Sequence, residues 1–326
     1  MKGFIYKKYG PPDVLKLTEL DKPSPAEGQV LIKVKAAAVN AYDWRLVSAT
    51  PFLVRIGGIG FFRPKQTKRQ VGADVAGIIE EVGPGVEGFA VGDKVFGALS
   101  PTGNGGFAEY ARAATKYLAH MPKNASFEEA AGLPMAAMTA LQGLRDEANV
   151  RTGEDVAISG ASGGVGHYAV QIAKALGARV TAVCSGAKAQ LAESLGADRV
   201  IDYKKEDFTA NGHKYDVIVG VNGYHHLNDY RRALKANGRY VMAGGNTKQL
   251  LQGTMRAKGI NKRNTQTLTL VREKPNAKDL EYLAELFEQG KLKTVIDRRF
   301  PLEETPQAVA LVAEGHVAGK VVVSLG

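Results

Sequence analysis

The sequence predicts an α/β protein with two domains, in which a doubly wound parallel sheet is joined to a smaller β-rich domain. The stretch from Asp155 to Val183 reads as strand, glycine turn, helix and strand, and this alternation continues to Ala243. Residues 1–98 instead carry short apolar runs separated by turns. A length of 326 residues also exceeds what one ordinary core supports, so two domains are expected.

The N-terminal part is predicted to consist of short strands. Val30, Ile32 and Val34 occupy alternate positions, the pattern of a half-buried strand, and residues 40–45 read as the start of a helix. Between residues 71 and 98 apolar runs alternate with glycine turns, as in a small β-barrel. Further strands are expected at residues 4–5, 15–20 and 106–110.

Residues 46–70 combine apolar side chains and glycines with a basic run at residues 63–69. Such a segment is a lid over a hydrophobic pocket, an ordinary loop packed on the core, or a patch that touches a membrane. The sequence alone leaves these three interpretations open.

A glycine turn at residues 160–166 lies between two apolar strands and leads into a helix that ends at Gly177. Glycine lets the backbone approach a pyrophosphate, and a helix start offers free N–H groups and the positive end of a dipole. Ala161 stands where the usual fingerprint has its first glycine. The context predicts dinucleotide binding, with a purely structural turn as the alternative.

The end of the second strand indicates which dinucleotide binds. NAD-binding folds usually place an acid there to hold the ribose 2′-OH, whereas residues 184–188 contain none. Ser185 and Lys188 offer a hydroxyl and a cation for a 2′-phosphate, and Tyr203 follows the next strand. We therefore expect NADPH rather than NADH; the alternative is that these three are solvated or packed loop residues.

The remaining elements continue the same order. Ser126 is a helix N-cap with acids in the first turn, and Pro134 interrupts the helix expected at residues 130–144. Further helices are expected at residues 229–236, 279–289 and 306–313. Further strands are expected at residues 200–202, 216–221, 239–243, 265–271, 295–300 and 320–325.

Composition favours a soluble globular protein. Hydrophobic residues make up 44% and charged residues 23% of the chain. The net charge of +10 permits an anionic partner, but the basic residues are mostly scattered and no nucleic-acid-binding module is recognisable, so nucleic acid is not expected. The sequence shows no apolar membrane-spanning run and no signal-peptide pattern, and its single cysteine, Cys184, fits the cytoplasm.

Six motifs together resemble one family. They are VNAYD at residues 39–43, GADVAG at 72–77, VGDKVFG at 91–97, GASGGVG at 160–166, TAVCS at 181–185 and IDY at 201–203. The chain is similar over its whole length to the medium-chain dehydrogenase/reductase superfamily. Within it, the chain resembles the zinc-free quinone oxidoreductase group, near its reticulon-4-interacting-protein-like and alkenal/one-oxidoreductase-like members.

The resemblance implies a GroES-like β-barrel domain, residues 1–123 and 275–326, and a Rossmann NADP-binding domain, residues 124–274, with the active site in the cleft. Zinc-dependent relatives place cysteine at Asn40 and His-Glu at Ala73 and Asp74, so no metal is expected. Without a Lewis acid, the substrate is expected to be a small, hydrophobic and already electrophilic quinone or enone.

The resemblance also assigns roles to individual residues. The pyrophosphate is expected at Ser162, Gly163, Gly164 and Val165, and the 2′-phosphate at Ser185, Lys188 and Tyr203. The nicotinamide half is expected at Gly244 and Gly245, beside Asn40, with Lys320 reaching the cofactor from the tail. His167 departs from the small or hydroxylated residue that relatives often carry there, and the Gly-Tyr-His-His run at residues 223–226 is unusual.

Three alternatives remain open on the sequence. Tyr42 is either the proton donor or an aromatic wall of the cleft, with solvent then supplying the proton. Residues 265–271 are expected to pair edge to edge in a homodimer, although some relatives are monomers. The competing functions are an NADPH-responsive nucleic-acid-binding or partner-binding protein and an NAD(P)-dependent alcohol dehydrogenase.

Overall fold

The computed structural model describes residues 1–50, 61–65, 70–221, 225–244 and 265–326. The chain forms two compact units, Met1–Met138 with Lys274–Gly326 and Thr139–Glu273. The sequence predicts that the chain divides after residue 123 and after residue 274. The first division falls later because α2 (Phe127–Gly132) packs on strands of the first unit rather than on the parallel sheet.

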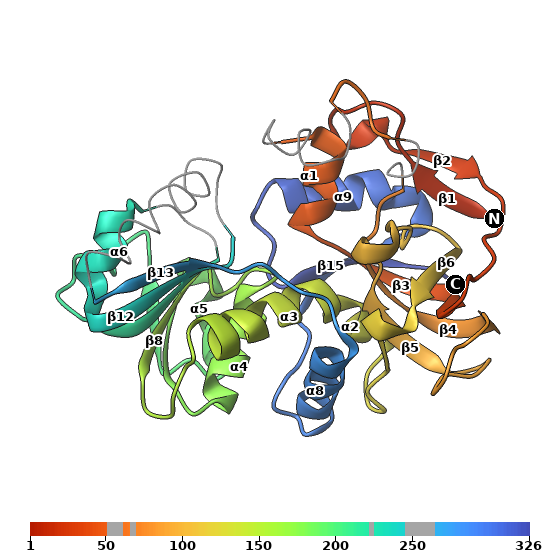
Figure 1. Ribbon diagram of the computed structural model, residues 1–326. Coiled ribbons are helices and arrows are strands. Elements are labelled where there is room, and N and C mark those ends of the chain that lie inside the picture. The colour runs from red at the N-terminus through yellow and green to blue at the C-terminus, as the bar shows by residue number, and fades with distance from the viewer. Residues whose placement is uncertain (51–60, 66–69, 222–224, 245–264) are drawn as a thin grey trace. The chain divides into compact units, whose positions relative to one another are not determined.

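The first unit is built on a mixed, mostly antiparallel sheet (Figure 1). Its strands run in the order β14-β15-β3-β4-β5-β7, and β6 also pairs with β3. Their bounds are β3 Gln29–Val39, β4 Asp74–Val82, β5 Lys94–Ala98, β6 Tyr110–Ala114, β7 Leu118–His120, β14 Ile296–Pro301 and β15 Lys320–Ser324. A separate antiparallel hairpin joins β1 (Lys2–Ile5) to β2 (Lys16–Glu19). Residues 320–324 thus lie beside residues 36–39 although they are far apart in the chain.

Among the described helices of the first unit, α2 packs on β3, β4 and β15, and α9 (Thr305–Ala313) packs on β14 and β15. The helix α1 (Ala41–Ser48) contacts α9, and α8 (Ala277–Glu288) contacts β7. Val30, Ile32 and Val34 of β3 are buried together, as the alternation predicts. Ser126 caps α2 by accepting the N–H of Glu129, also as predicted.

The second unit is a six-stranded parallel sheet in the order β10-β9-β8-β11-β12-β13, the doubly wound arrangement that the sequence predicts. Its strands are β8 Asp155–Ser159, β9 Arg179–Cys184, β10 Arg199–Asp202, β11 Tyr215–Gly220, β12 Leu234–Met242 and β13 Thr267–Leu270. Its helices are α4 Gly166–Ala175, α5 Ala189–Ser194 and α6 Leu227–Ala233. The helix α3 (Pro134–Gln142) runs from the first unit into the second, and a π-helical turn (Gly143–Glu147) follows it.

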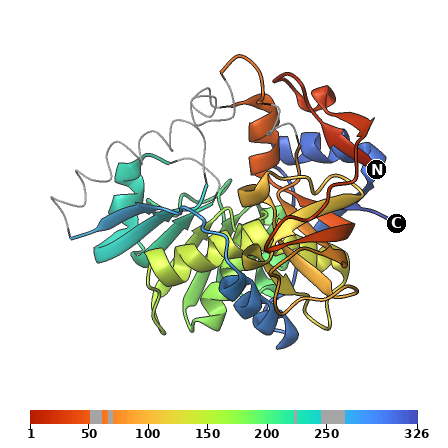
Figure 2. The same ribbon diagram turned by 45° about the vertical axis from the view of Figure 1, so that its right-hand side comes forward.

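Helices cover both faces of the parallel sheet. Figures 1 and 2 show α4 on one face and α6 on the other, and α4 contacts both β8 and β9. Because β8, β9 and β10 are parallel, their last residues, Ser159, Cys184 and Asp202, lie at one edge of the sheet. This is the edge at which doubly wound sheets bind ligands.

Two predicted elements were wrong in position. The strand expected at residues 106–110 lies at Tyr110–Ala114, where it pairs with β3, and Ala108 makes only an isolated bridge to Gly3. The helix expected at residues 229–236 ends at Ala233, because Leu234 already pairs with Tyr215 of β11. Tertiary pairing overrides the local helical pattern at this point.

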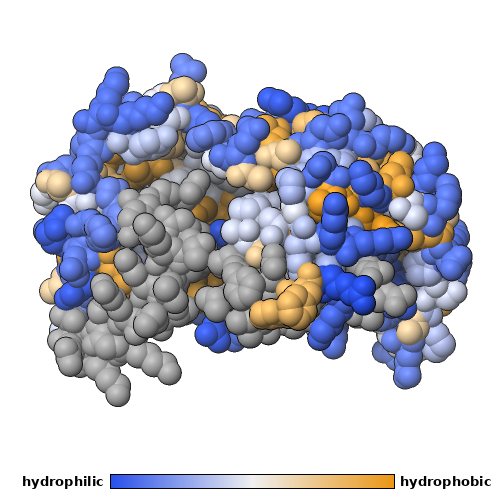
Figure 3. Space-filling model, turned by 90° about the horizontal axis from the view of Figure 1, so that it is seen from above, coloured by the Kyte–Doolittle hydropathy of each residue, from blue (hydrophilic) through white to orange (hydrophobic). Residues whose placement is uncertain are grey.

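Only part of the segment 46–70 can be described. Residues 51–60 and 66–69 lie outside the described residues, as do Gly245 and the Gly-Tyr part of the run at 223–226. Phe62 is 88% exposed and meets Phe61 edge to face. Figure 3 shows a largely hydrophilic face with hydrophobic atoms in separate areas. None of the described helices is long and apolar enough to cross a membrane.

Candidate active site

The glycine turn folds tightly because glycine stands where a side chain would clash. A Cβ on Gly166 would lie 2.0 Å from the carbonyl oxygen of Gly160, and Gly160 itself has a φ of 85°. The N–H groups of Gly160 and Ala161 both donate to Val183 O, at 3.0 and 3.1 Å. Ala161 is buried, and it does not have a positive φ. The backbone at this position therefore does not require glycine.

The same turn presents unused hydrogen-bond donors. The N–H of Gly163 donates to Gly160 O at 3.2 Å, but among the described residues those of Ser162, Gly164 and Val165 donate to no backbone carbonyl. They precede α4, whose N-terminal end carries partial positive charge. Successive free N–H groups at a helix start suit an anion such as a phosphate.

Ser185, Lys188 and Tyr203 follow two neighbouring strands. Ser185 comes directly after β9, and Tyr203 directly after β10, with its N–H donating to Cys184 O at 3.2 Å. Lys188 closes a short 3-10 helix, and its N–H donates to Ser185 O at 2.8 Å. Tyr203 is 55% exposed, so its ring is available to a ligand. The structure therefore brings these three to one edge of the sheet.

Asp202 is a carboxylate at this edge to which the sequence analysis gave no role. It pairs with Cys184 in the sheet, and its Oδ1 accepts the N–H of Lys204 at 3.1 Å. A Cβ on Gly186 would lie 2.6 Å from its Oδ2, so a larger residue at position 186 would displace this carboxylate. The second strand itself still ends without an acid, as the sequence indicates.

Gly244 lies two residues after the end of β12. Its N–H donates to Gly220 O at 3.2 Å, and a Cβ on Gly244 would lie 2.6 Å from Val221 O. Close backbone packing therefore requires glycine at this position.

A buried polar cluster in the first unit consists of Asn40, Asp43, Asp74 and Lys320. Asn40 is the N-cap of α1, Asp43 lies in its first turn, and Asp74 and Lys320 begin β4 and β15. Lys320 Nζ donates to Asn40 Oδ1 at 2.6 Å, and Asn40 Nδ2 donates to Asp74 Oδ2 at 2.9 Å. The amide of Asn40 is thus held at both ends, which fixes its orientation.

Backbone donors complete the cluster. Asp43 accepts the N–H groups of Asn40 and Gly72, at 2.8 and 3.0 Å, and so ties α1 to the segment before β4. Asp74 Oδ1 accepts the N–H of Met135 at 3.1 Å. Every charged group of the cluster therefore has a hydrogen-bond partner, as buried charges require.

Burial dominates the electrostatics of the cluster. Asp43 and Asp74 are 0% exposed and Lys320 is 2% exposed. Loss of hydration raises the pKa of Asp74 to about 7 and that of Asp43 to about 6, against the opposing effect of Lys320. The same burial lowers the pKa of Lys320. The cluster therefore gains or loses a proton near neutral pH.

Tyr42 lies on the same helix but outside the cluster. It is half-buried and packs against Leu46 and Ala49, beside Tyr9. Both alternatives for Tyr42, proton donor and aromatic wall of the cleft, therefore stay predictions.

The cluster does not fit a zinc ion. The described residues hold no group of three or more His, Cys, Asp or Glu side chains arranged for a metal. At the positions in question Asn40 is engaged with Asp74, and the Lys320 ammonium lies 4.0 Å from Asp74 Oδ2. The Lys320 ammonium beside Asp74 repels a divalent cation, Asp43 is engaged with backbone N–H groups, and zinc sites need three or four ligands.

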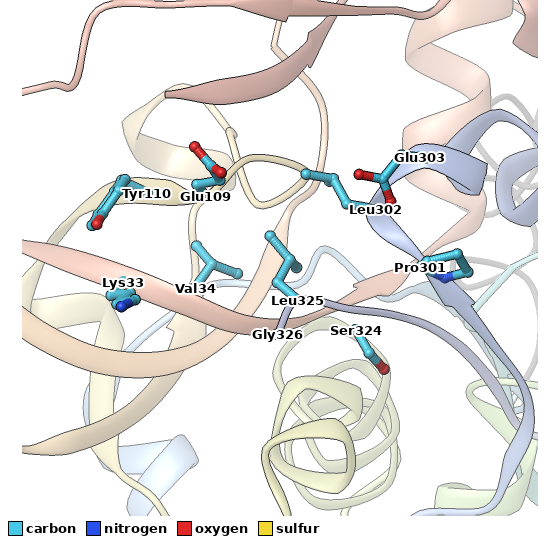
Figure 4. A pocket seen from close by; sticks show the side chains of 10 residues that line it. All are labelled: Lys33, Val34, Glu109, Tyr110, Pro301, Leu302, Glu303, Ser324, Leu325 and Gly326. Atoms are coloured by element: carbon cyan, nitrogen blue, oxygen red, sulfur yellow. The ribbon is translucent and has the colours of Figure 1, made fainter.

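A cavity of about 410 Å³ lies elsewhere in the first unit (Figure 4). Figure 4 shows the side chains of Glu109 and Glu303 in its lining, with Leu302 between them. None of the predicted site residues lines this cavity, so it is not the predicted site.

Sequence reasoning missed the role of Asp74, which it weighed only as a metal ligand. Asp74 meets Lys320 because β15 pairs with the end of β3, where Val321 lies opposite Val39. An acid at the start of a buried strand is a usable signal, because carboxylates are rarely fully buried without a partner.

Comparison with known proteins places these sites in a family context. Residues 26–123 match the family model of the alcohol dehydrogenase GroES-like domain, and residues 195–323 match that of zinc-binding dehydrogenases. The chloroplast envelope quinone oxidoreductase homolog of Arabidopsis thaliana is 35% identical over 333 residues, covering 99% of this chain and 98% of that protein.

Two further relatives agree with this match. The NADPH-dependent alkenal/one oxidoreductase of Arabidopsis thaliana is 34% identical over 340 residues, covering 99% of this chain and 79% of that protein. The structure of the quinone oxidoreductase from Coxiella burnetii superposes with a TM-score of 0.88 and 31% identity, covering 100% of this chain and 99% of that one.

Proposed function

Because this chain belongs to the medium-chain dehydrogenase/reductase superfamily, alongside quinone and alkenal/one oxidoreductases, we propose that it is an NADPH-dependent reductase. Its substrates are quinones or alkenes conjugated to a carbonyl, and no metal takes part. The relatives named for these activities support the reaction class.

One observation from the structure carries the proposal. The glycine turn offers the N–H groups of Ser162, Gly164 and Val165, and β9 is followed by Ser185 and Lys188 rather than by an acid. The first feature suits a pyrophosphate and the second a 2′-phosphate. Together they fit NADPH better than NADH.

In this proposal the cofactor is held along the edge of the parallel sheet. The turn from Ser162 to Val165 binds the pyrophosphate through its N–H groups. Ser185, Lys188 and Tyr203 bind the 2′-phosphate, and the glycines at 244 and 245 let the backbone approach the nicotinamide half.

We propose that Asn40, whose amide orientation the buried polar cluster fixes, contacts the nicotinamide ribose. The Lys320 ammonium donates to Asn40 Oδ1 and the Asp74 carboxylate accepts from Nδ2, so one amide orientation is favoured. We therefore propose that Lys320 acts on the cofactor through Asn40. Bound NADPH supplies the hydride, and the protein orients donor and acceptor.

An electrophilic acceptor is needed because the cluster offers no Lewis acid. In an enone, hydride addition at the β-carbon moves the π electrons onto the carbonyl oxygen, and the resulting enolate takes a proton at the α-carbon. Tyr42 is the proposed proton donor, and water is the alternative. A saturated ketone lacks this path and requires stronger polarisation of its carbonyl.

Two finer proposals concern assembly and location. We propose that β13 (Thr267–Leu270), the last strand in the order of the parallel sheet, pairs with its copy in a homodimer. We also propose a cytoplasmic location, which the one free and buried cysteine supports, although several relatives are named chloroplastic or mitochondrial. Light scattering and cell fractionation test these proposals.

Steady-state oxidation of NADPH and NADH tests the function. We expect turnover with a small quinone and with an unbranched enone, and a higher kcat/KM for NADPH. A saturated ketone of the same length should turn over far more slowly. Failure to oxidise NADPH with any quinone or enone would remove the assignment.

A further inference from the structure

We propose that His167 is a positioning residue for the glycine turn: its ring holds the carbonyl of Gly163 so that the N–H of Gly164 is directed at the cofactor pyrophosphate. The identity of the ligand rests on the proposed function. The geometry of the turn does not.

Two donors from the first turn of α4 converge on one carbonyl oxygen. His167 Nδ1 lies 3.0 Å from Gly163 O, and the backbone N–H of His167 donates to the same oxygen, also at 3.0 Å. A carbonyl can only accept, so Nδ1 carries a proton in this contact. The side chain thus adds a second restraint to a peptide that the helix already holds.

The restraint acts on the neighbouring N–H. A trans peptide is planar, and its C=O and N–H point in opposite directions. With Gly163 O drawn towards α4, the N–H of Gly164 points away from the helix start, and among the described residues it meets no backbone acceptor. Gly163 and Gly164 have no side chains and rotate easily, so an added anchor matters most here.

The ring is itself held in place. His167 is 0% exposed, and its ring centroid lies 3.8 Å from that of Tyr168. Gln171 Nε2 donates to the backbone carbonyl oxygen of His167 at 2.9 Å, which fixes the backbone that carries the ring. Burial of a polar ring is costly, and an apolar side chain would serve packing alone at a lower cost. The hydrogen bond to Gly163 O offsets part of that cost, and it explains why a polar ring occupies this buried position.

The test compares three replacements at this position. In His167→Asn the amide nitrogen falls near the place of Nδ1, whereas in His167→Gln it reaches the place of Nε2, and His167→Leu has no donor. Dissociation constants for NADPH and NADH are measured from the fluorescence of the bound nucleotide. The pyrophosphate is common to both cofactors, so both constants should change together.

We expect the leucine and glutamine variants to have higher dissociation constants for both NADPH and NADH. The two constants should rise by the same factor, roughly 3- to 10-fold for the loss of one neutral hydrogen bond. The asparagine variant should bind like the wild type, and kcat at saturating NADPH should stay within about twofold of wild type in all three. A purely structural role would not give equal factors for both cofactors together with rescue by asparagine.

Wild-type affinity in a folded leucine variant would overturn the proposal, as would an effect on NADPH alone. If the leucine variant does not fold, equal affinities of the asparagine and glutamine variants overturn it instead. Wild-type protein that binds no NADPH would contradict the proposed function, which is a separate outcome.

Discussion

Replacing Asp74 with asparagine should change how the stability of the first unit depends on pH. Burial raises the pKa of Asp74 from 3.8 to about 7 in the folded protein. Below about pH 4 the carboxyl group is protonated in both the folded and unfolded states, so it contributes no pH dependence. As the pH rises from about 4 to about 7, the unfolded chain loses this proton first, and the free energy of unfolding therefore falls.

The size of the effect follows from the pKa difference. A difference of roughly 3 pH units corresponds to on the order of 4 kcal/mol. The asparagine side chain of Asp74→Asn cannot ionise, so the variant lacks this pH-dependent contribution to the free energy of unfolding. Asp43 and Lys320 are present in both the wild type and the variant. The wild type should therefore lose stability relative to the variant between pH 4 and pH 8, by up to that amount.

Urea unfolding followed by tryptophan fluorescence measures this directly. Trp44 is the single tryptophan, and it lies on α1 in the same unit as Asp74. Glu87→Gln, which removes an exposed carboxylate after β4, is the matched control and should differ from the wild type by a constant amount. A constant difference for Asp74→Asn as well would refute the electrostatic description of the buried polar cluster.

Three further predictions concern the cofactor and the proton. Lys188→Ala should raise the KM for NADPH at least tenfold, because a charge-assisted hydrogen bond contributes about 1.5–3 kcal/mol, and should spare NADH; equal effects on both cofactors would contradict the 2′-phosphate role. Tyr42→Phe should lower kcat about 100-fold with an enone while leaving the KM for NADPH unchanged, and an unaltered kcat would assign the proton to water. Gly166→Ala places a Cβ 2.0 Å from Gly160 O and should abolish NADPH binding measured by calorimetry; wild-type affinity in this variant would contradict the tight turn.

The parallel sheet could be predicted because its signals are local. The glycine turn, the apolar strand before it and the helix after it lie within about thirty residues, and each limits what the next can be. The register of β8, β9 and β10 then brings Ser185 and Tyr203 to one edge without further information.

Other features depend on contacts between distant segments. The helix expected at residues 229–236 stops early because Leu234 pairs with β11, which no local pattern shows. Lys320 and Asn40 are separated by 280 positions, and their contact requires the pairing of β15 with β3. A lysine at the start of an apolar strand reads locally as an exposed end, whereas its side chain is fully enclosed.

Transfer of deuterium from NADPH labelled at the nicotinamide C4 tests the central claim most directly. The enzyme is first treated with a chelator, its metal content is measured, and the reduced enone is analysed by mass spectrometry and NMR. The account predicts one deuterium at the β-carbon of the product and undiminished turnover by metal-depleted enzyme. A product without deuterium at that carbon, or activity that returns only when zinc is added, would contradict it.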